Sequence, residues 1–486
     1  MSVRIVRLAS TAALVATAQL SAPVGAQVGA QGTPAAGLPP IRPLGKATAT
    51  STELLGAVSQ VRALPGGRVL VNDNLGRKVV LFEPGLNAYK VVADTTSATA
   101  NAYSSRAGGL IAYKGDSTLF VDPISLSMLV IDAKGNVGRV ISVPRPNEAQ
   151  ALIGGPNGTP GFDAQGRLVY RAPPNFRIAS PAPGAAGAAG AAGAAGGFQM
   201  PQFPESVAVV RIALDTRRVD TVAFIKIPKQ NISMTQSADG RMSVSTTINP
   251  MPVVDDWAVT ADGRVAVVRG QEYKVDWVDG TGAIAASNKV PFAWRRLDDS
   301  TKTAFIDSTR SAMEKLREQV LARQQAGGAG NAGIAAAAPA LAAAAGIDIG
   351  AMVGARTEIR MGDGGGRASA PGAAAGGPPP SGGPANLTIP PLNFVQPSEL
   401  PDYAPPFAAG AVRGDVDGNV WIRTSNMYNG GSVYDIVNAK GELTDRVLLP
   451  AGRVIAGFGP GVVYMGYRES AAGVRLEVAP IRGATP

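Results

Sequence analysis

The chain has 486 residues, a formal net charge of +9, no cysteine and no histidine. The absence of cysteine excludes disulfides, thiolate nucleophiles and iron–sulfur clusters, and the absence of histidine excludes serine–histidine–aspartate triads and histidine metal ligands. The basic residues are scattered along the chain rather than gathered in runs, so no nucleic-acid partner is expected. Any catalysis would have to use carboxylates, lysine, tyrosine, serine or an oxygen-ligated metal.

The N-terminus is predicted to be a secretory signal peptide over residues 1–26. Arg4 and Arg7 provide a short positive start, residues 8–20 are mostly Ala, Leu and Val, and small residues lead to Ala26. The apolar run is shorter than the roughly 20 residues that a membrane span needs, so no transmembrane span is expected. We therefore predict an exported protein, located in the periplasm, in the outer envelope or in the medium.

A disordered leader is expected over residues 27–45, which are rich in Gly, Pro, Ala and Gln. From about Ser51 onward one pattern recurs, a polar turn with Gly followed by a short run rich in Val, Leu and Ile. Its six copies occupy residues 65–73, 114–122, 164–170, 261–268, 415–422 and 459–465. Several copies are followed by a second strand-like run that ends in a hairpin turn. Short hairpin-linked strands with a period of about 40 to 50 residues are typical of propeller blades.

The repeat also resembles a known family. Residues 415–424, DVDGNVWIRT, are similar to the repeat of NHL-like propellers. The body as a whole resembles bacterial exported six-bladed β-propellers of the NHL/TolB-like kind. The fold class expected is therefore all-β, a six-bladed β-propeller with an inserted α-helix and low-complexity loops, with seven blades as the alternative. We place the propeller at residues 46–295 and 390–482.

Closure of the ring is predicted to involve the N-terminal region. The last repeat offers three strand-like runs, and a blade needs four. The polar, β-branched residues 46–52 precede the first blade and can supply the missing outer strand. A ring closed in this way leaves no exposed sheet edge.

Two segments interrupt the repeats. Residues 184–197 carry Gly at every third position but almost no proline, which favours a Gly/Ala loop over a collagen-like helix. Residues 296–325 are predicted to form an inserted helix, because apolar side chains recur at three-to-four spacing from Phe305 to Val320. Residues 326–389 follow as a low-complexity, disordered insertion. We expect the helix to pack on the propeller and to be the place where a partner would dock.

The candidate binding residues lie just before and after one predicted blade. Asp255 and Asp256 precede an inner strand, where paired carboxylates could ligate calcium or act as acid and base, although such pairs commonly cap turns. Trp277 and Trp421 are predicted to be inter-blade core. The binding candidates are Asp255, Asp256, Trp257, Trp294 and Arg295. No catalytic residue and no resident cofactor are predicted, and calcium stays open.

Two functional classes remain. The first is an exported, non-catalytic propeller that acts as a scaffold for a small-molecule or protein ligand in the cell envelope. The alternative is a calcium- and carboxylate-dependent propeller enzyme, similar to lactonases or lyases. The resemblance implies that such enzymes commonly need a histidine or a cluster of acidic and amide side chains at the pore, and this chain has no histidine. Acidic side chains from three or more blades meeting at the pore would favour the enzyme.

The signal-peptide prediction can be tested directly. Cleavage after Ala26 should leave a mature protein that begins at Gln27. Intact-mass measurement of exported protein should therefore give the mass of residues 27–486, and a mass that includes Met1 would contradict the prediction.

Overall fold

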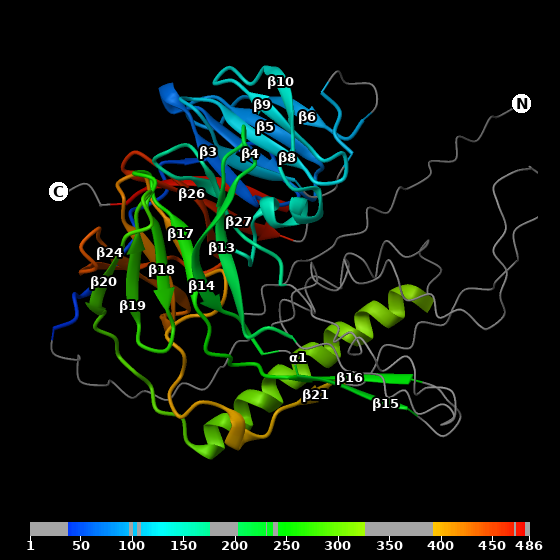
Figure 1. Cartoon of the computed structure of the whole chain (residues 1–486), viewed down its shortest axis with the longest axis vertical. Helices are drawn as coiled ribbons and strands as arrows, with labels where there is room; N and C mark the ends of the chain where they lie inside the picture. The colour runs from blue at the N-terminus through cyan, green and yellow to red at the C-terminus, as the bar shows by residue number, and fades with distance from the viewer. Residues whose placement is uncertain are drawn as a thin grey trace, which may run out of the picture.

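The computed structural model describes residues 37–96, 101–104, 108–174, 203–229, 231–236, 242–325, 392–470 and 473–481 (Figure 1). The predicted signal peptide, the Gly/Ala loop at 184–197 and the insertion at 326–389 lie outside these residues. Within them, six antiparallel sheets follow one another along the chain as the blades of a β-propeller, and one small separate sheet lies beside them. The six-bladed prediction is confirmed, and the seven-bladed alternative is not.

The blades are built from consecutive strands. Blade 1 holds β3 (Gln60–Ala63), β4 (Val69–Asp73), β5 (Lys78–Phe82) and β6 (Tyr89–Asp94). Blade 2 holds β7 (Gly109–Ala112), β8 (Thr118–Asp122), β9 (Ser127–Ile131) and β10 (Val137–Ser142). Blade 3 holds β11 (Gly161–Phe162), β12 (Leu168–Arg171), β13 (Ser206–Ile212) and β14 (Val219–Lys226).

The second half of the ring repeats this pattern. Blade 4 holds β17 (Asp256–Val259), β18 (Val265–Arg269), β19 (Lys274–Val278) and β20 (Ile284–Lys289). Blade 5 holds β22 (Val412–Gly414), β23 (Val420–Tyr428), β24 (Gly431–Val437) and β25 (Leu443–Leu448). Blade 6 holds β26 (Arg453–Gly459), β27 (Val462–Ser470), β28 (Gly473–Pro480) and, from the start of the chain, β2 (Ala49–Thr50).

The recurring sequence pattern corresponds to the first hairpin turn and second strand of each blade. These strands read as continuous apolar runs because neighbouring blades cover both faces of each sheet. β4 and β8 are buried along their whole length. Trp421 and Trp277 lie between blades with 0% and 4% of their surface exposed, as predicted.

The ring closes as the sequence predicts. β2 pairs antiparallel with β28, with Ala49 opposite Val478 and Thr50 opposite Glu477. The leader prediction does not hold at β1 (Ile41–Pro43), which pairs parallel with β25 of blade 5. Arg42 donates a hydrogen bond from Nε to Asp445 Oδ2 at 2.8 Å. Specific long-range contacts of this kind order a segment whose composition alone predicts disorder.

The two ends of the ring are different. At one end, the turn end, the first and third connections of the blades are tight hairpins, such as Asp415 N–H to Asn419 O at 3.0 Å and Asp132 N–H to Asn136 O at 2.9 Å. The opposite end, the loop end, carries the connections between blades and the second connection within each blade, and together these include all the long ones. The up-and-down order of four strands per blade makes this unavoidable, because every blade is entered and left at the same end.

A small annex extends from the loop end (Figure 1). The sequence places residues 231–248 in the propeller, whereas the structure places them in a separate sheet. This sheet holds β15 (Asn231–Gln236), β16 (Met242–Ile248) and β21 (Asn393–Phe394), where β21 pairs parallel with β16. Beside it lie α1 (Asp299–Gln325) and the short helix η4 (Pro397–Glu399).

The inserted helix α1 lies within the range predicted for it. Its buried Ile306 and Met313 pack on the returning chain around Val395 and on Ile248 of β16. Lys302 is almost fully buried and its ammonium contacts Asp402 at 2.9 Å. The helix therefore rests mainly on the annex and the returning chain rather than on a blade. None of the helices that the structure describes is long and apolar enough to cross a membrane.

Loss of the closing strands should destabilise the ring. A chain that starts at Glu53 lacks β1 and β2, exposes the edge of β28 and loses the buried Leu44, which is 6% exposed. Burial of one leucine contributes about 2 kcal/mol, and about 1 kcal/mol corresponds to roughly 1–2 °C in a domain larger than about 250 residues. Calorimetry should give a Tm at least about 3 °C below that of a chain starting at Gly37, and equal Tm values would refute the closure.

Candidate functional site

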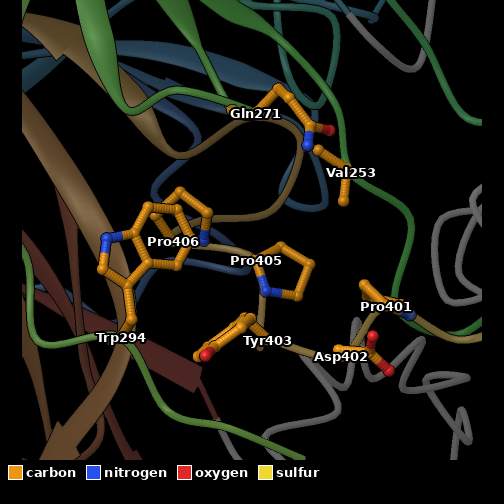
Figure 2. Close-up of a pocket in the computed structure, with 9 residues that line it drawn as sticks. Val253, Gln271, Trp294, Pro401, Asp402, Tyr403, Pro405 and Pro406 are labelled. Carbon is orange, nitrogen blue, oxygen red and sulfur yellow. The ribbon is translucent and has the colours of Figure 1, made fainter.

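A hollow of 570 Å³ opens at the loop end beside blade 4 (Figure 2). This volume lies within the range of about 300 to 1,000 Å³ that ligand pockets occupy. Its walls come from the chain that leaves blade 4, the chain that returns to blade 5, and the turn between β18 and β19. The residues that shape it most are Gln271, Trp294, Pro401, Tyr403, Pro405 and Pro406. Gln271 and Val253 lie together across the hollow from Tyr403 (Figure 2).

Two exposed aromatic rings dominate one wall. Trp294 and Tyr403 expose 43% and 49% of their surface. Their rings meet edge to face with centroids 6.5 Å apart, and Trp294 meets Phe292 in the same way at 5.3 Å. Phe292 rests in turn on buried Tyr273 at 5.0 Å. The exposed rings are thus the outer end of an aromatic row that starts in the core.

Backbone pairing holds this wall in place. The chain leaving blade 4 and the chain returning to blade 5 form an antiparallel bridge between Arg296 and Tyr403. Leu297 N–H donates to Asp402 O at 2.8 Å, and Ala404 N–H donates to Arg295 O at 2.9 Å. The closely spaced prolines of the returning chain restrict its φ angles further. Trp294 and Tyr403 are therefore positioned before any ligand arrives.

Below the row, Tyr273 anchors blade 4 to blade 5. Its hydroxyl donates to Asp435 Oδ2 at 2.7 Å, and Arg446 lies 3.4 Å from the other carboxylate oxygen. Burial raises the pKa of Tyr273 far above its ordinary value, so the phenol stays protonated and keeps donating. This contact is structural, and it fixes the Tyr273 ring against which Phe292 packs.

Asp255 is held in place by backbone hydrogen bonds and by an arginine. Its carboxylate accepts the Lys226 and Gly270 backbone N–H groups at 3.0 and 3.1 Å. Arg269 Nη1 lies 2.9 Å from it, and Arg269 Nε lies 2.7 Å from Asp276. Asp255 thus ties the chain entering blade 4 to the β18–β19 turn.

Asp256 begins the inner strand β17 and is 3% exposed. Its two oxygens accept the Trp257 and Val412 N–H groups, both at 2.9 Å, so it joins blade 4 to blade 5. Burial raises the pKa of Asp256 to about 6, against the opposing effects of these donors and of Arg171. A carboxyl with this pKa changes its charge at mildly acidic pH.

Trp257 and Arg295 occupy different settings. Trp257 is fully buried and donates its indole N–H to Asn157 O at 3.0 Å. Gly158 lies so close that a Cβ there would be 2.5 Å from the indole nitrogen. Arg295 is exposed next to Trp294. The candidates therefore fall into two groups, the buried inner-strand residues 255–257 and the exposed pair 294–295, and only Trp294 lines the hollow.

The sequence analysis missed the other half of the wall. Tyr403, Pro405 and Pro406 line the hollow and follow the long insertion. A cluster of aromatic and proline residues at 401–407, PDYAPPF, was a visible signal of a shaped surface. Its partner Trp294 precedes the insertion, so no local pattern could show that the two rings meet.

The donor groups at the loop end do not suit calcium. Calcium takes about 6 to 8 oxygen ligands. Asp256 is surrounded by N–H donors and Arg171, and Asp255 by N–H donors and Arg269, none of which has a lone pair to offer a cation. Across the described ranges, no group of three or more Asp and Glu side chains could hold a metal. Among the described residues, the structure thus shows no metal-holding group of acidic side chains of the kind that would favour the enzyme alternative.

Comparison with known proteins adds only a general likeness. A gluconolactonase from Xanthomonas campestris is 9% identical, with a TM-score of 0.32 over 90% of this chain and 99% of that one. Regucalcin, a calcium-binding protein from Agrobacterium tumefaciens, is 10% identical, with a TM-score of 0.35 over 91% and 98%. A Bacteroides fragilis protein that is described as exported is 9% identical, with a TM-score of 0.36 over 90% of this chain and 94% of that one.

These values are too low to transfer a function from any of the three proteins. No protein-family model and no curated protein matches the chain significantly. The assignment of six blades therefore rests on the sheets of this structure. The narrower resemblance to NHL- or TolB-like propellers stays a prediction.

Asp256 should give the stability of the protein a distinct pH dependence. A carboxyl whose pKa is higher in the folded than in the unfolded chain stabilises the fold below about pH 4, and this contribution disappears as the pH rises through about 6. Relative to wild type, Asp256→Asn should therefore gain about 2 to 3 kcal/mol of unfolding free energy between pH 4 and pH 7. Urea unfolding across this range measures the difference.

Asp262 provides the matched control. Burial raises its pKa, but hydrogen bonds from Thr260 and Arg264 outweigh burial, so its pKa is lowered. Asp262→Asn should change relative stability with the opposite sign, losing stability relative to wild type as the pH rises toward the ordinary aspartate pKa of about 3.9. A difference between Asp256→Asn and wild type that is independent of pH would contradict the buried, raised carboxyl.

Proposed function

We propose that the chain is an exported, non-catalytic β-propeller that binds a protein or small-molecule partner in the cell envelope through the hollow at its loop end. The observation that carries this proposal is the aromatic wall of the hollow. Trp294 and Tyr403 expose nearly half of their surface although both are held in one geometry by backbone pairing and ring contacts.

Positioned, exposed aromatic rings are well suited to binding. Trp and Tyr are enriched among the residues that dominate interface energies, because they bury a large area. Rings that are already fixed lose little conformational entropy when a partner arrives. The prolines around them present further apolar surface without flexible side chains.

The exposed apolar surface continues beyond the hollow, which favours a protein as partner. Met427 and Tyr428, at the end of β23, expose 56% and 51% of their surface. The same strand is joined to the wall of the hollow by Ser425 N–H, which donates to Pro406 O at 2.8 Å. An extended surface with exposed aromatics and Met matches the composition of protein interfaces.

The carboxylates near the hollow support binding over acid–base catalysis. Asp255 is paired with Arg269, and Asp402 with Lys302. Asp256 is buried beneath backbone N–H donors. A general acid or base needs to reach the proton it transfers, and these three groups are either paired or enclosed. The calcium-dependent enzyme therefore has no specific observation in its favour.

The test is a capture experiment with a matched control. Wild-type protein, Trp294→Ala and Phe224→Ala are immobilised, and proteins from envelope extracts of the source cells are captured and identified by mass spectrometry. Phe224 is also exposed, at 61%, but lies on the outer strand of blade 3. Loss of a central interface aromatic typically costs about 2 kcal/mol or more, which is roughly 30-fold in Kd.

We expect a partner that is retained by wild type and Phe224→Ala and is lost by Trp294→Ala. Circular dichroism should show that both variants stay folded, because Trp294 and Phe224 are exposed. Equal capture by all three proteins would contradict a role for the hollow.

A further inference from the structure

A second feature of the loop end is a pair of arginines on one face of blade 5. In the register of β22 and β23, Arg413 lies opposite Trp421, and Arg423 donates its backbone N–H to Ala411 O at 3.0 Å. Arg413 and Arg423 are thus diagonal neighbours on the same face, within reach of one another for long side chains. Tyr434 lies opposite Arg423 on β24 and shares this face.

The face in question packs against blade 6. Trp421 and Tyr434 share a core cluster with Ile455 and Phe458 of β26. Arg413 and Arg423 lie at its inner margin and are both half-buried, so they keep contact with solvent. Arg413 reaches away from its own blade, because its Nη1 donates to Thr159 Oγ1 at 3.2 Å, in the segment that leads into β11 of blade 3. The pair therefore lies where the inner strands converge.

Neither guanidinium has a carboxylate partner among the residues that the structure describes. The carboxylates that surround this face are already engaged. Asp435 takes the Tyr273 hydroxyl and Arg446 on the opposite face, and Glu477 takes Arg453 at 2.6 Å. Asp256 influences Arg413 electrostatically, but both of its oxygens accept backbone N–H groups.

This arrangement places two positive charges side by side in a partly buried position. Burial lowers the pKa of Arg413, and the neighbouring positive charge of Arg423 acts in the same direction. Each guanidinium offers five N–H donors in a planar fork, and the described residues provide one side-chain acceptor for Arg413, the hydroxyl of Thr159. Two like charges that are partly desolvated repel one another unless an anion lies between them.

We propose that Arg413 and Arg423 form a binding site for an oxyanion, the carboxylate or phosphate group of a small ligand, where the inner strands converge. Two guanidiniums match the planar, multi-oxygen geometry of these groups. The hydroxyl of Thr159 supplies a further donor. The site uses none of the residues that line the hollow, so it does not depend on the hollow being a binding site.

The test uses the mature protein and inorganic phosphate as the probe. Tm is measured by calorimetry over a range of phosphate concentrations, with sodium chloride keeping the ionic strength constant. A parallel series replaces phosphate with acetate, so that the larger response identifies the group that the site prefers. Wild type is compared with Arg413→Gln, Arg423→Gln and Arg310→Gln. Arg310 is a matched control, an arginine on α1 that is paired with Asp307 at 2.8 Å.

For wild type and Arg310→Gln we expect Tm to rise with the logarithm of anion concentration, as binding to the folded state requires. Arg413→Gln and Arg423→Gln should weaken the response about tenfold or more. Without added phosphate or acetate, Arg423→Gln should melt at or above the wild-type Tm, because it removes the repulsion between like charges. A purely structural arginine would instead give a lower Tm.

The proposal is overturned if neither anion raises the wild-type Tm, or if both Gln variants respond as wild type does. Isothermal titration of phosphate and of acetate into wild-type protein provides a measurement that needs no variant. Absence of binding heat at several temperatures in both titrations would also overturn the proposal.

Discussion

The structure depends on one constraint, which is that the central strands of every blade are apolar on both faces. A sheet of this kind is stable only when another sheet covers each side, and a closed ring covers all of them at once. The chain has no cysteine to provide cross-links, so packing and strand pairing must maintain the closure. Pairing of β2 with β28, together with the parallel pairing of β1 with β25, joins the start of the chain to its last two blades.

The ring also decides where long connections can lie. Four strands per blade return the chain to the same end each time, so the insertions gather at the loop end while the turn end keeps tight hairpins. The annex, the aromatic wall of the hollow and the segment carrying Thr159 all belong to the loop end. At the opposite end, hydrogen bonds such as those of Asp415 hold the turns close to the sheet.

Electrostatics at the loop end divide the polar groups into two kinds. The carboxylates have donors or arginines of their own, as with Asp255 and Arg269 or Glu477 and Arg453. Arg413 and Arg423 differ, because in the described residues no carboxylate lies within ion-pair distance of either. The loop end therefore offers cationic and apolar recognition rather than a set of oxygen ligands for a metal, which is consistent with binding by the propeller.

The sequence by itself determined the blades, because a repeat with a 40- to 50-residue period encodes local hairpins and continuous apolar strands. It also determined the closing strand, since the last repeat lacks one, and the buried positions of Trp277 and Trp421. Only the tertiary structure decided that Ile41–Pro43 pairs with blade 5, that residues 231–248 leave the ring, and that Trp294 meets Tyr403 across the long insertion. The position of Arg413 beside Arg423 on one face of blade 5 likewise depends on strand register. Local periodicity cannot report such contacts, because they join segments that are set side by side only when the ring has closed.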